Sequence, residues 1–152
     1  MELKDIYSFD FNTLKIVDIV DFKMKYLTRI IQNCSVDAED ENACMLWQRA
    51  LDPDGYGKLT YRYKTVSEDG TIKKHRGDGR CHRMVFALTY DSLHLLDPHF
   101  KYIDVSHICH TKSCCNPLHL ETELGHQNGS RTSCRRQRWT PCPHYPQCIY
   151  KL

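Results

Sequence analysis

Two groups of cysteine and histidine residues in the C-terminal half of the sequence have the types and spacing of zinc ligands. In the first group, Cys114 follows Cys109 by five residues and His119 follows Cys114 by five. Thiolates and imidazoles at short loop spacing suit Zn²⁺, and a structural zinc site needs four such ligands. The fourth must come from elsewhere in the chain: Cys44 is favoured, and Cys81 is the alternative. We expect a structural zinc ion here.

The second group supplies all four ligands from one short segment: Cys134, Cys142, His144 and Cys148. Three prolines interrupt this segment, and it has no hydrophobic periodicity, so it cannot bury enough apolar surface to offset its conformational entropy without a metal. Free or disulfide-bonded cysteine is the alternative for both groups. The chain has nine cysteines, an odd number, and several are close to histidines, which favours two zinc ions in a reducing compartment. The remaining cysteines are Cys34, Cys81 and Cys115.

Four further elements are expected around these groups. Apolar residues at helical spacing predict an N-terminal helix over residues 13–33, with Asn12 or Thr13 as its cap. Its expected apolar face comprises Ile16, Val20, Leu27, Ile30 and Ile31. Residues 80–88 are predicted as a short helix, residues 102–106 as a strand, and residues 121–132 as a helix weakened by two glycines.

Residues 58–76 are predicted to form a β-hairpin with one cationic face. Apolar and basic residues alternate strictly over residues 58–65, and residues 68–70 offer the turn. Residues 71–76 return as the second strand, and the glycines at 77 and 79 end it. A two-stranded ribbon of this kind fits the major groove of DNA, and a basic face that only keeps the protein soluble is the alternative. The expected DNA contacts are Lys58, Thr60, Arg62, Lys64, Lys73, Lys74 and Arg76.

The distribution of charge agrees with a polyanionic partner. Residues 1–57 carry six basic and eleven acidic residues, whereas residues 58–152 carry fifteen basic and eight acidic residues. A solvated surface of mixed charge is the other interpretation. The 152 residues fit one domain, no apolar run is long enough to span a membrane, and the N-terminus lacks a signal-peptide pattern. We therefore expect an intracellular protein, in the nucleus of a eukaryote or otherwise in the cytoplasm.

The motifs together resemble the His-Cys box homing endonucleases, a family of ββα-metal (His-Me finger, HNH-like) nucleases. The resemblance covers about residues 44–148 and rests on residues 106–120, Asn128 and the second Cys/His group. Upstream, residues 44–47, 54–57 and 82–86 resemble the segment before the finger in phage-type HNH endonucleases, whereas residues 1–40 match no named segment. The resemblance implies an α+β fold: a small zinc-stabilised ββα-metal finger with an antiparallel hairpin for DNA binding. An N-terminal helical segment (residues 1–43) would precede this nuclease domain (residues 44–152), in one compact unit.

The resemblance also assigns roles. The general base of the family falls on His107 and its Mg²⁺-binding asparagine on Asn128. An arginine near the scissile phosphate has three candidates, Arg76, Arg80 and Arg83, of which Arg76 is preferred; Arg131 could also contact a phosphate or face solvent. The implied zinc ligands are Cys44, Cys109, Cys114 and His119 in the first site, and Cys134, Cys142, His144 and Cys148 in the second.

The implied activity is that of a Mg²⁺-dependent endonuclease that hydrolyses phosphodiester bonds in double-stranded DNA, with the site specificity of homing enzymes as a further expectation. A neutral histidine can take a proton from water, and Mg²⁺ can stabilise the charge that develops on the phosphate. The alternative is a zinc-stabilised module that binds DNA without cutting it. One branch of the family dimerises through a swapped C-terminal tail, and only four residues follow Cys148 here. A homodimer is therefore expected to use another surface.

Overall fold

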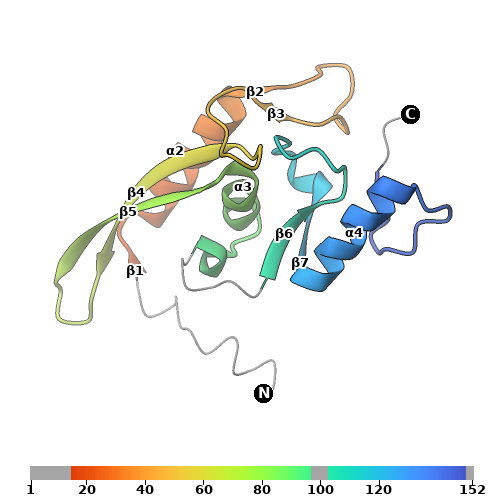
Figure 1. Cartoon of the computed structure of the whole chain (residues 1–152). Coiled ribbons are helices and arrows are strands. Elements are labelled where there is room, and N and C mark those ends of the chain that lie inside the picture. Colours follow the sequence, from red (N-terminus) through yellow and green to blue (C-terminus); the bar gives the residue numbers. More distant parts are fainter. Residues whose placement is uncertain (1–14, 97–102, 150–152) are drawn as a thin grey trace.

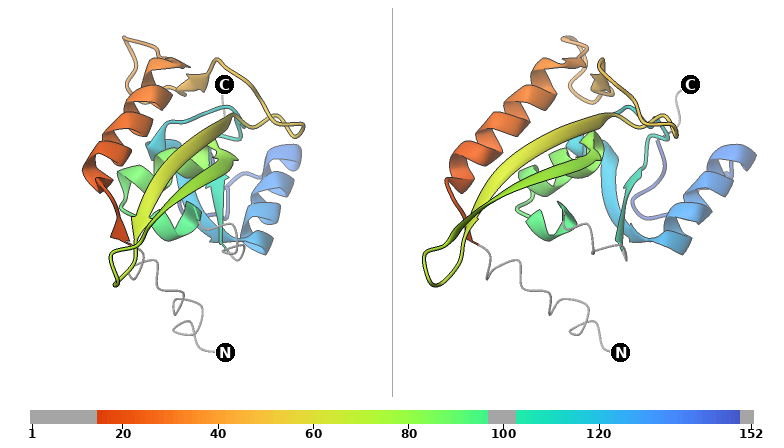
Figure 2. Two further views of the ribbon diagram at one scale, coloured as in Figure 1. Left: turned by 90° about the vertical axis from the view of Figure 1, so that its left-hand side faces the viewer. Right: turned by 60° about the vertical axis from the view of Figure 1, so that its left-hand side comes forward.

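A long β-hairpin and a C-terminal ββα unit extend from opposite sides of a small central core (Figures 1 and 2). The computed structural model describes residues 15–96 and 103–149. Its elements are a mixture of helices and antiparallel strand pairs, which confirms the α+β class. None of the helices in the described ranges is long and apolar enough to cross a membrane.

The N-terminal helix α2 (Ile19–Gln32) is shorter than predicted, and its predicted apolar face is confirmed only in part, since Ile30 is buried and Leu27 packs against the core. Ile16, expected within the helix, belongs instead to strand β1 (Lys15–Ile16), which pairs with the hairpin. The helix buries Phe22, Tyr26 and Ile30, whereas Val20 and Ile31 are exposed. Aromatic side chains, which the apolar pattern had left out, form this contact because they bury more surface than aliphatic ones. The predicted cap at residues 12 and 13 lies outside the described residues.

The hairpin consists of β4 (Lys58–Val66) and β5 (Ile72–Arg80), so its second strand is longer than predicted. The two glycines expected to end that strand, Gly77 and Gly79, pair with Tyr61 and Leu59 instead. A side chain at Gly77 would collide with the ring of Tyr61, because a Cβ there would lie 2.3 Å from that ring. Glycine inside a strand is thus explained here by the close approach of an aromatic ring.

The core is formed where the hairpin, α2 and helix α3 (Cys81–Thr89) meet. Met84, Val85 and Leu88 of α3 are buried, as the sequence predicts, beside Leu59 of the hairpin and Phe22 of α2. A short 3-10 helix, η1 (Leu93–Leu96), packs against α3. One hydrophobic core therefore contains side chains from both the N-terminal segment (residues 1–43) and the segment after it (residues 44–152).

The C-terminal unit has the order strand, strand, helix. Strand β6 (Ile103–His107) pairs with β7 (Leu120–Leu124), and α4 (Gly125–Gln137) packs against both. The prediction of a helix from residue 121 was therefore wrong for residues 121–124. These residues pair with β6 instead, and the helix begins at Gly125, where the side chain of Gln127 accepts a hydrogen bond from the Leu124 backbone N–H at 2.9 Å.

Candidate metal centres and catalytic pocket

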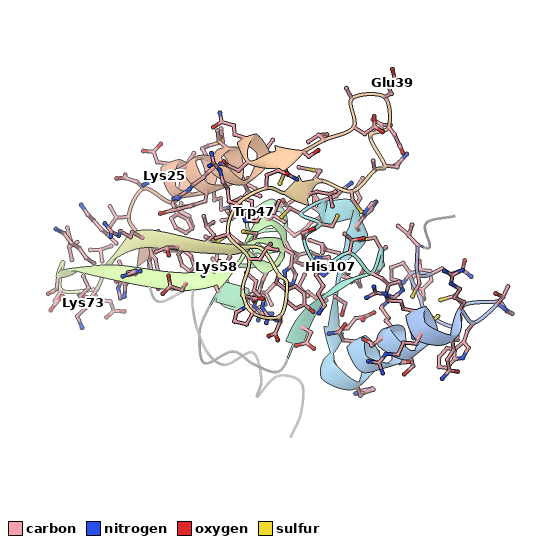
Figure 3. The ribbon with its side chains drawn as sticks, turned by 45° about the horizontal axis from the view of Figure 1, so that its top comes forward. Lys25, Glu39, Trp47, Lys58, Lys73 and His107 are labelled. Carbon is pink, nitrogen blue, oxygen red and sulfur yellow. The ribbon has the colours of Figure 1, made fainter. Side chains whose placement is uncertain are left out.

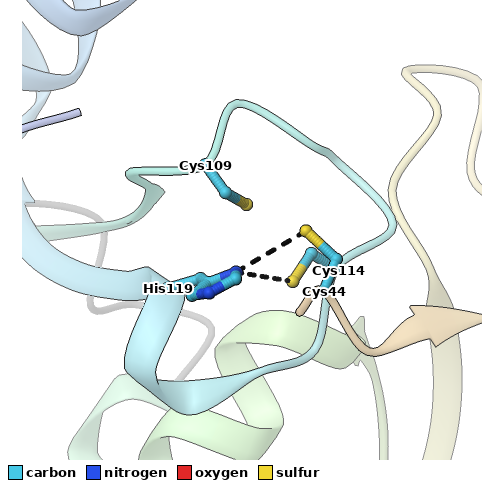
Figure 4. A group of neighbouring side chains, drawn as sticks. All are labelled: Cys44, Cys109, Cys114 and His119. Carbon is cyan, nitrogen blue, oxygen red and sulfur yellow. Dashed lines mark hydrogen bonds between the residues drawn. The ribbon is translucent and has the colours of Figure 1, made fainter. Parts of the chain in front are cut away.

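The first Cys/His group is assembled from two distant parts of the chain. Cys44, Cys109, Cys114 and His119 each place a ligand atom within 4.8 Å of the others. His119 Nδ1 lies 3.5 Å from Cys44 Sγ and 3.6 Å from Cys114 Sγ (Figure 4). Cys44 reaches the site because β3 (Leu46–Trp47), which pairs with β2 (Cys34–Ser35), also contacts the loop after β6. The four soft and borderline ligands fit a structural zinc ion.

The surroundings of this tetrad orient its histidine. His119, on the 3-10 helix η2 (Pro117–His119), donates its Nε2–H to the carbonyl of Asn42 at 2.7 Å. That bond leaves Nδ1, which faces the sulfur atoms, without a proton and ready to bind metal. A hydrogen bond with the neighbouring Cys114 thiol lowers the pKa of the Cys109 thiol, which favours the thiolate form that binds zinc.

The second tetrad lies between α4 and the segment that follows it. Cys134, Cys142, His144 and Cys148 again have ligand atoms within 4.8 Å of one another. Ser130 Oγ lies 2.9 Å from His144 Nε2 and fixes the ring, as Asn42 does in the first site. Burial acts to raise the pKa of the Cys142 thiol, but the backbone N–H groups of Cys148 and His144 lower it to about 6. This set also fits a structural zinc ion.

Arg131 is buried beside the second tetrad and is not a surface residue. Its Nε donates to Glu123 Oε1 at 2.6 Å, and its Nη1 donates to the carbonyl of Pro146 at 2.7 Å and to Cys148 Sγ at 3.5 Å. Only 1% of its side chain is exposed, so the solvent-facing role that the sequence left open does not agree with its position, although Arg131 does line the pocket that holds His107 and Asn128. Arg131 ties β7 and α4 to the loop that carries the zinc ligands.

Replacing Arg131 with methionine should therefore destabilise the protein by about 3–5 kcal/mol, because Glu123 would keep a buried charge without its partner. Urea denaturation of the zinc-saturated protein measures the effect. Arg135→Met, an exposed arginine on the same helix, is the matched control and should change stability by no more than about 0.5 kcal/mol. A loss in the Arg131 variant no larger than in the control would contradict a structural role for the ion pair.

The three cysteines outside the tetrads lie in or beside the hydrophobic core. Cys81 and Cys115 are buried, and Cys34 packs against them from the partly exposed strand β2. A hydrogen bond with Cys115 and burial raise the pKa of the Cys34 thiol, which suits a neutral packing residue. Cys81 is therefore not brought to the first tetrad, where Cys44 completes the set.

His107 ends strand β6 and is held by the loop of the first tetrad. Its Nε2–H donates to the carbonyl of Cys114 at 2.9 Å, so Nδ1 is the nitrogen that can accept a proton. The side chain is 9% exposed, and burial lowers its pKa. A histidine in this state is neutral near pH 7, as a general base must be.

A stack of rings fixes the orientation of the His107 imidazole. The ring of His82, from α3, lies 4.4 Å from it, and that of Tyr56 lies 5.8 Å away. Arg80 lies over the ring of Tyr56, with its guanidinium carbon 4.0 Å from the ring centroid. Arg80 also forms ion pairs with Asp52 at 2.8 Å and Asp54 at 2.9 Å, so the turn at residues 52–57 positions both the arginine and the tyrosine.

His107 and Asn128 line one pocket of about 490 Å³. Asn128 lies on α4, and its Nδ2 donates to Asp104 Oδ2 of β6 at 3.1 Å. Lys112, Arg135 and Arg136 line the same pocket and give it a positive charge. The pocket thus combines a proton acceptor, an amide oxygen and cationic walls, a combination suited to chemistry on a phosphate group.

The preferred arginine of the sequence, Arg76, lines the cavity along the hairpin and not the pocket of His107, and the same is true of Arg80 and Arg83. Arg76 is exposed on β5, 3.8 Å from Asp78, whereas the Arg80 guanidinium is close enough to lower the pKa of His107. Arg83 is used inside the fold, since it donates to the carbonyls of Leu95 and Ile103. From the sequence, Arg80 was only one of three candidates. The two aspartates of the turn at residues 52–57, which orient Arg80, were the signal that could have favoured it over Arg76.

The basic face of the hairpin is largely as predicted. Its register places Arg62 opposite Arg76 and Lys64 opposite Lys74, with these side chains exposed on one face. Lys73 differs, because it pairs with the buried Thr65 and so belongs to the opposite face, near the hairpin tip. Lys58 lies at the other end of the hairpin, nearer His107 (Figure 3). The basic face leads from the tip toward the pocket.

The ββα unit and its two Cys/His tetrads define a zinc-stabilised protein of the His-Me finger class. The family model described as the zinc-binding loop region of homing endonuclease matches residues 43–152, and the chain belongs to this family. No curated protein and no solved structure matches the chain. The family connects the chain to nuclease function and to DNA binding.

Proposed function

We propose that the protein is a metal-dependent DNA endonuclease in which His107 is the general base and Asn128 binds a catalytic Mg²⁺. The observation that carries the proposal is that these two side chains, distant in sequence, line one cationic pocket. Neither a single histidine nor a single asparagine would indicate catalysis on its own. Together with Lys112 and Arg135 they supply what phosphodiester hydrolysis requires.

His107 can act on a water molecule without changing its own orientation. The bond to the Cys114 carbonyl occupies Nε2, and the rings of His82 and Tyr56 hold the imidazole plane. Nδ1 then accepts a proton from water, and the oxygen of that water attacks phosphorus. The leaving 3′ oxygen departs on the opposite side in an in-line displacement.

The pocket fits a hard divalent cation better than a third zinc ion. Asn128 offers an amide oxygen in a polar pocket, and oxygen is the ligand type that Mg²⁺ prefers. Zinc in either Cys/His tetrad has four protein ligands and therefore no open position for substrate. When bound, Mg²⁺ would supply charge stabilisation to the phosphate and to the leaving oxygen.

Arg80 is the arginine that we assign to the scissile phosphate, in place of Arg76. Its guanidinium lies over the ring of Tyr56, which lines the pocket, and two carboxylates fix its direction. A preoriented guanidinium loses little freedom when it binds a phosphate. Arg76 is then left as a contact of the hairpin with the DNA backbone.

The hairpin is the proposed DNA-binding surface. Like charges directly opposite one another destabilise a sheet, and here Arg62 faces Arg76 and Lys64 faces Lys74. A polyanion lying along this face would remove that repulsion. The arrangement favours DNA binding over a face that merely maintains solubility, for which alternating charges would serve better.

Replacing Arg62 and Lys64 together with glutamine should weaken binding to duplex DNA and reduce the salt dependence of the affinity. Each lost phosphate contact is expected to lower the slope of log affinity against log salt by about 0.9. Fluorescence anisotropy over a range of salt concentrations measures this slope. Lys25→Gln, which removes an exposed charge from α2, is the control and should leave the slope unchanged. An unchanged slope in the double variant would exclude the hairpin as the DNA-binding surface.

Incubation of the zinc-loaded protein with supercoiled plasmid tests the proposed activity directly. Cleavage that requires added Mg²⁺ supports the endonuclease, and the ratio of nicked to linear product shows whether one or both strands are cut. Omitting Mg²⁺ is a better control than adding EDTA, because EDTA also competes for the zinc ions. A mobility shift without cleavage on a broad pool of DNA sequences would contradict the enzyme and support a DNA-binding module.

A further inference from the structure

A carboxylate lies directly beside the amide that is proposed to bind Mg²⁺. Asp104, on β6, accepts a hydrogen bond from Asn128 Nδ2 at 3.1 Å and is half-buried. It lies three residues before His107 on the same strand, and no sequence motif had singled it out. Helix α4 begins next to it, since a Cβ at Gly125 would be 3.8 Å from Asp104 Oδ2. The strand and the helix therefore bring an acidic and an amide side chain together.

The separation of these two groups is that of neighbouring ligands on one small cation. Mg²⁺ binds oxygen at 2.0–2.1 Å in octahedral geometry, so adjacent ligand atoms lie roughly 3 Å apart. A half-turn of the Asn128 amide exchanges its nitrogen and oxygen, which have nearly the same shape. That turn would place two oxygen atoms at the spacing that now separates Asn128 Nδ2 from Asp104 Oδ2.

We propose that Asp104 and Asn128 together form the divalent-cation site, with Asp104 contributing a carboxylate oxygen. This inference rests on the proposed function, in which Asn128 binds Mg²⁺, and adds a negatively charged ligand to the neutral amide. Mg²⁺ is usually held in proteins by one or two carboxylates together with oxygens of the substrate and water. The carboxylate makes the site anionic before DNA arrives.

The surroundings of Asp104 are compatible with this role. Glu123, its partner across the β6–β7 ladder, is neutralised by Arg131 and takes no part in the site. The positive charge of Arg83 acts on Asp104, but its hydrogen bonds to the carbonyls of Leu95 and Ile103 hold its guanidinium to the backbone. Asp104 also lines the cavity along the hairpin, whereas Asn128 lines the pocket of His107. The pair therefore stands where the DNA-binding face meets the catalytic pocket.

Binding of Mn²⁺ to the zinc-loaded full chain tests the proposal without reference to catalysis. Electron paramagnetic resonance measures free Mn²⁺ during a titration, and Mn²⁺ competes poorly for thiolate sites that hold zinc. Asp104→Asn and Asn128→Ala each remove one direct ligand and should weaken Mn²⁺ binding by more than the roughly 10–100-fold that the loss of an outer-shell partner costs. Glu121→Gln, a carboxylate on the paired strand β7, is the matched control and should bind as the unaltered chain does.

The asparagine variant separates a ligand from a positioning residue. Asparagine at 104 still accepts a hydrogen bond from the Asn128 amide, so a residue that only orients Asn128 predicts unchanged Mn²⁺ affinity. Binding within about threefold of the unaltered chain would therefore overturn the proposal. If Asp104→Asn loses zinc or the circular dichroism spectrum of the folded chain, Asp104→Glu is used in its place. Mn²⁺ binding that is retained with the longer carboxylate supports the site. Loss of Mn²⁺ binding in a folded, zinc-loaded Asp104→Glu protein argues against the site.

The outcomes for the cation site and for the activity are distinguishable. Loss of Mn²⁺ binding in Asp104→Asn, with no DNA cleavage by the unaltered chain, keeps the cation site and rejects the nuclease. Cleavage that is Mg²⁺-dependent in the unaltered chain and equally efficient in Asp104→Asn keeps the nuclease and rejects Asp104 as a ligand. The Mg²⁺ concentration for half-maximal cleavage should rise in Asp104→Asn if both proposals hold.

Discussion

Replacing His107 with alanine is expected to lower the rate of Mg²⁺-dependent DNA cleavage by about 10²–10⁴-fold, the usual contribution of a positioned general base. The imidazole is the proton acceptor at the end of β6, and its Nε2 is already committed to the Cys114 carbonyl. Single-turnover cleavage of a plasmid measures the effect. DNA affinity and zinc content should stay near normal, because neither tetrad includes this residue.

His107→Gln and His126→Ala sharpen that measurement. Glutamine can still donate a hydrogen bond to the Cys114 carbonyl but cannot take up a proton near pH 7, so it should be as inactive as alanine while preserving the loop. His126 is an exposed histidine on α4, and its replacement should leave the rate unchanged. Cleavage at the normal rate by folded His107→Ala protein would remove this residue from the mechanism.

Loss of a ligand from the first tetrad is expected to unfold the loop that carries His107. Cys114→Ser should reduce the zinc content from two ions to one per chain, and cleavage should fall below detection, since the carbonyl of residue 114 in this loop holds the His107 ring. Structural zinc contributes about 10–16 kcal/mol of apparent binding free energy in small zinc-dependent folds. Elemental analysis of zinc and proteolysis of the loop between β6 and β7 measure the two effects.

The neighbouring cysteine provides a matched control. Cys115 is as deeply buried as Cys114 but belongs to the hydrophobic core and to neither tetrad. Cys115→Ala should therefore keep two zinc ions and lose only a modest amount of stability from the small cavity it leaves. Equal loss of zinc in both variants would show that the site depends on general packing of the loop and not on a specific thiolate.

The zinc ligands were readable from the sequence because each tetrad depends on residue type and short spacing. Three of the four ligands of the first site, and all four of the second, lie within segments too short to place them far apart. The fourth ligand of the first site was different. Cys44 and Cys81 were both open choices on spacing alone, and the contact of β3 with the loop after β6 brings Cys44 to the site.

The hairpin and the first helix show where periodicity was insufficient. Alternation gave the correct faces of β4, because a strand exposes its residues in turn. The length of β5 was underestimated, since glycine ends many strands and only the ring of Tyr61 accounts for its presence here. The buried face of α2 was predicted only in part, because several faces of that helix carry apolar residues. Ile30 is buried and Leu27 packs against the core as predicted, but contact with the hairpin also buries the aromatic residues Phe22 and Tyr26.

The sequence by itself determined the two metal-binding groups, the basic strand and, by resemblance, the expected roles of His107 and Asn128. These features are local, and they follow from the chemistry of a few side chains at fixed intervals. Tertiary structure alone decided that Arg80 lies beside the His107 pocket, that Arg131 is buried, and that Asp104 meets Asn128. Each of those outcomes depends on how one element packs against another, and residue spacing within a single segment does not determine that packing.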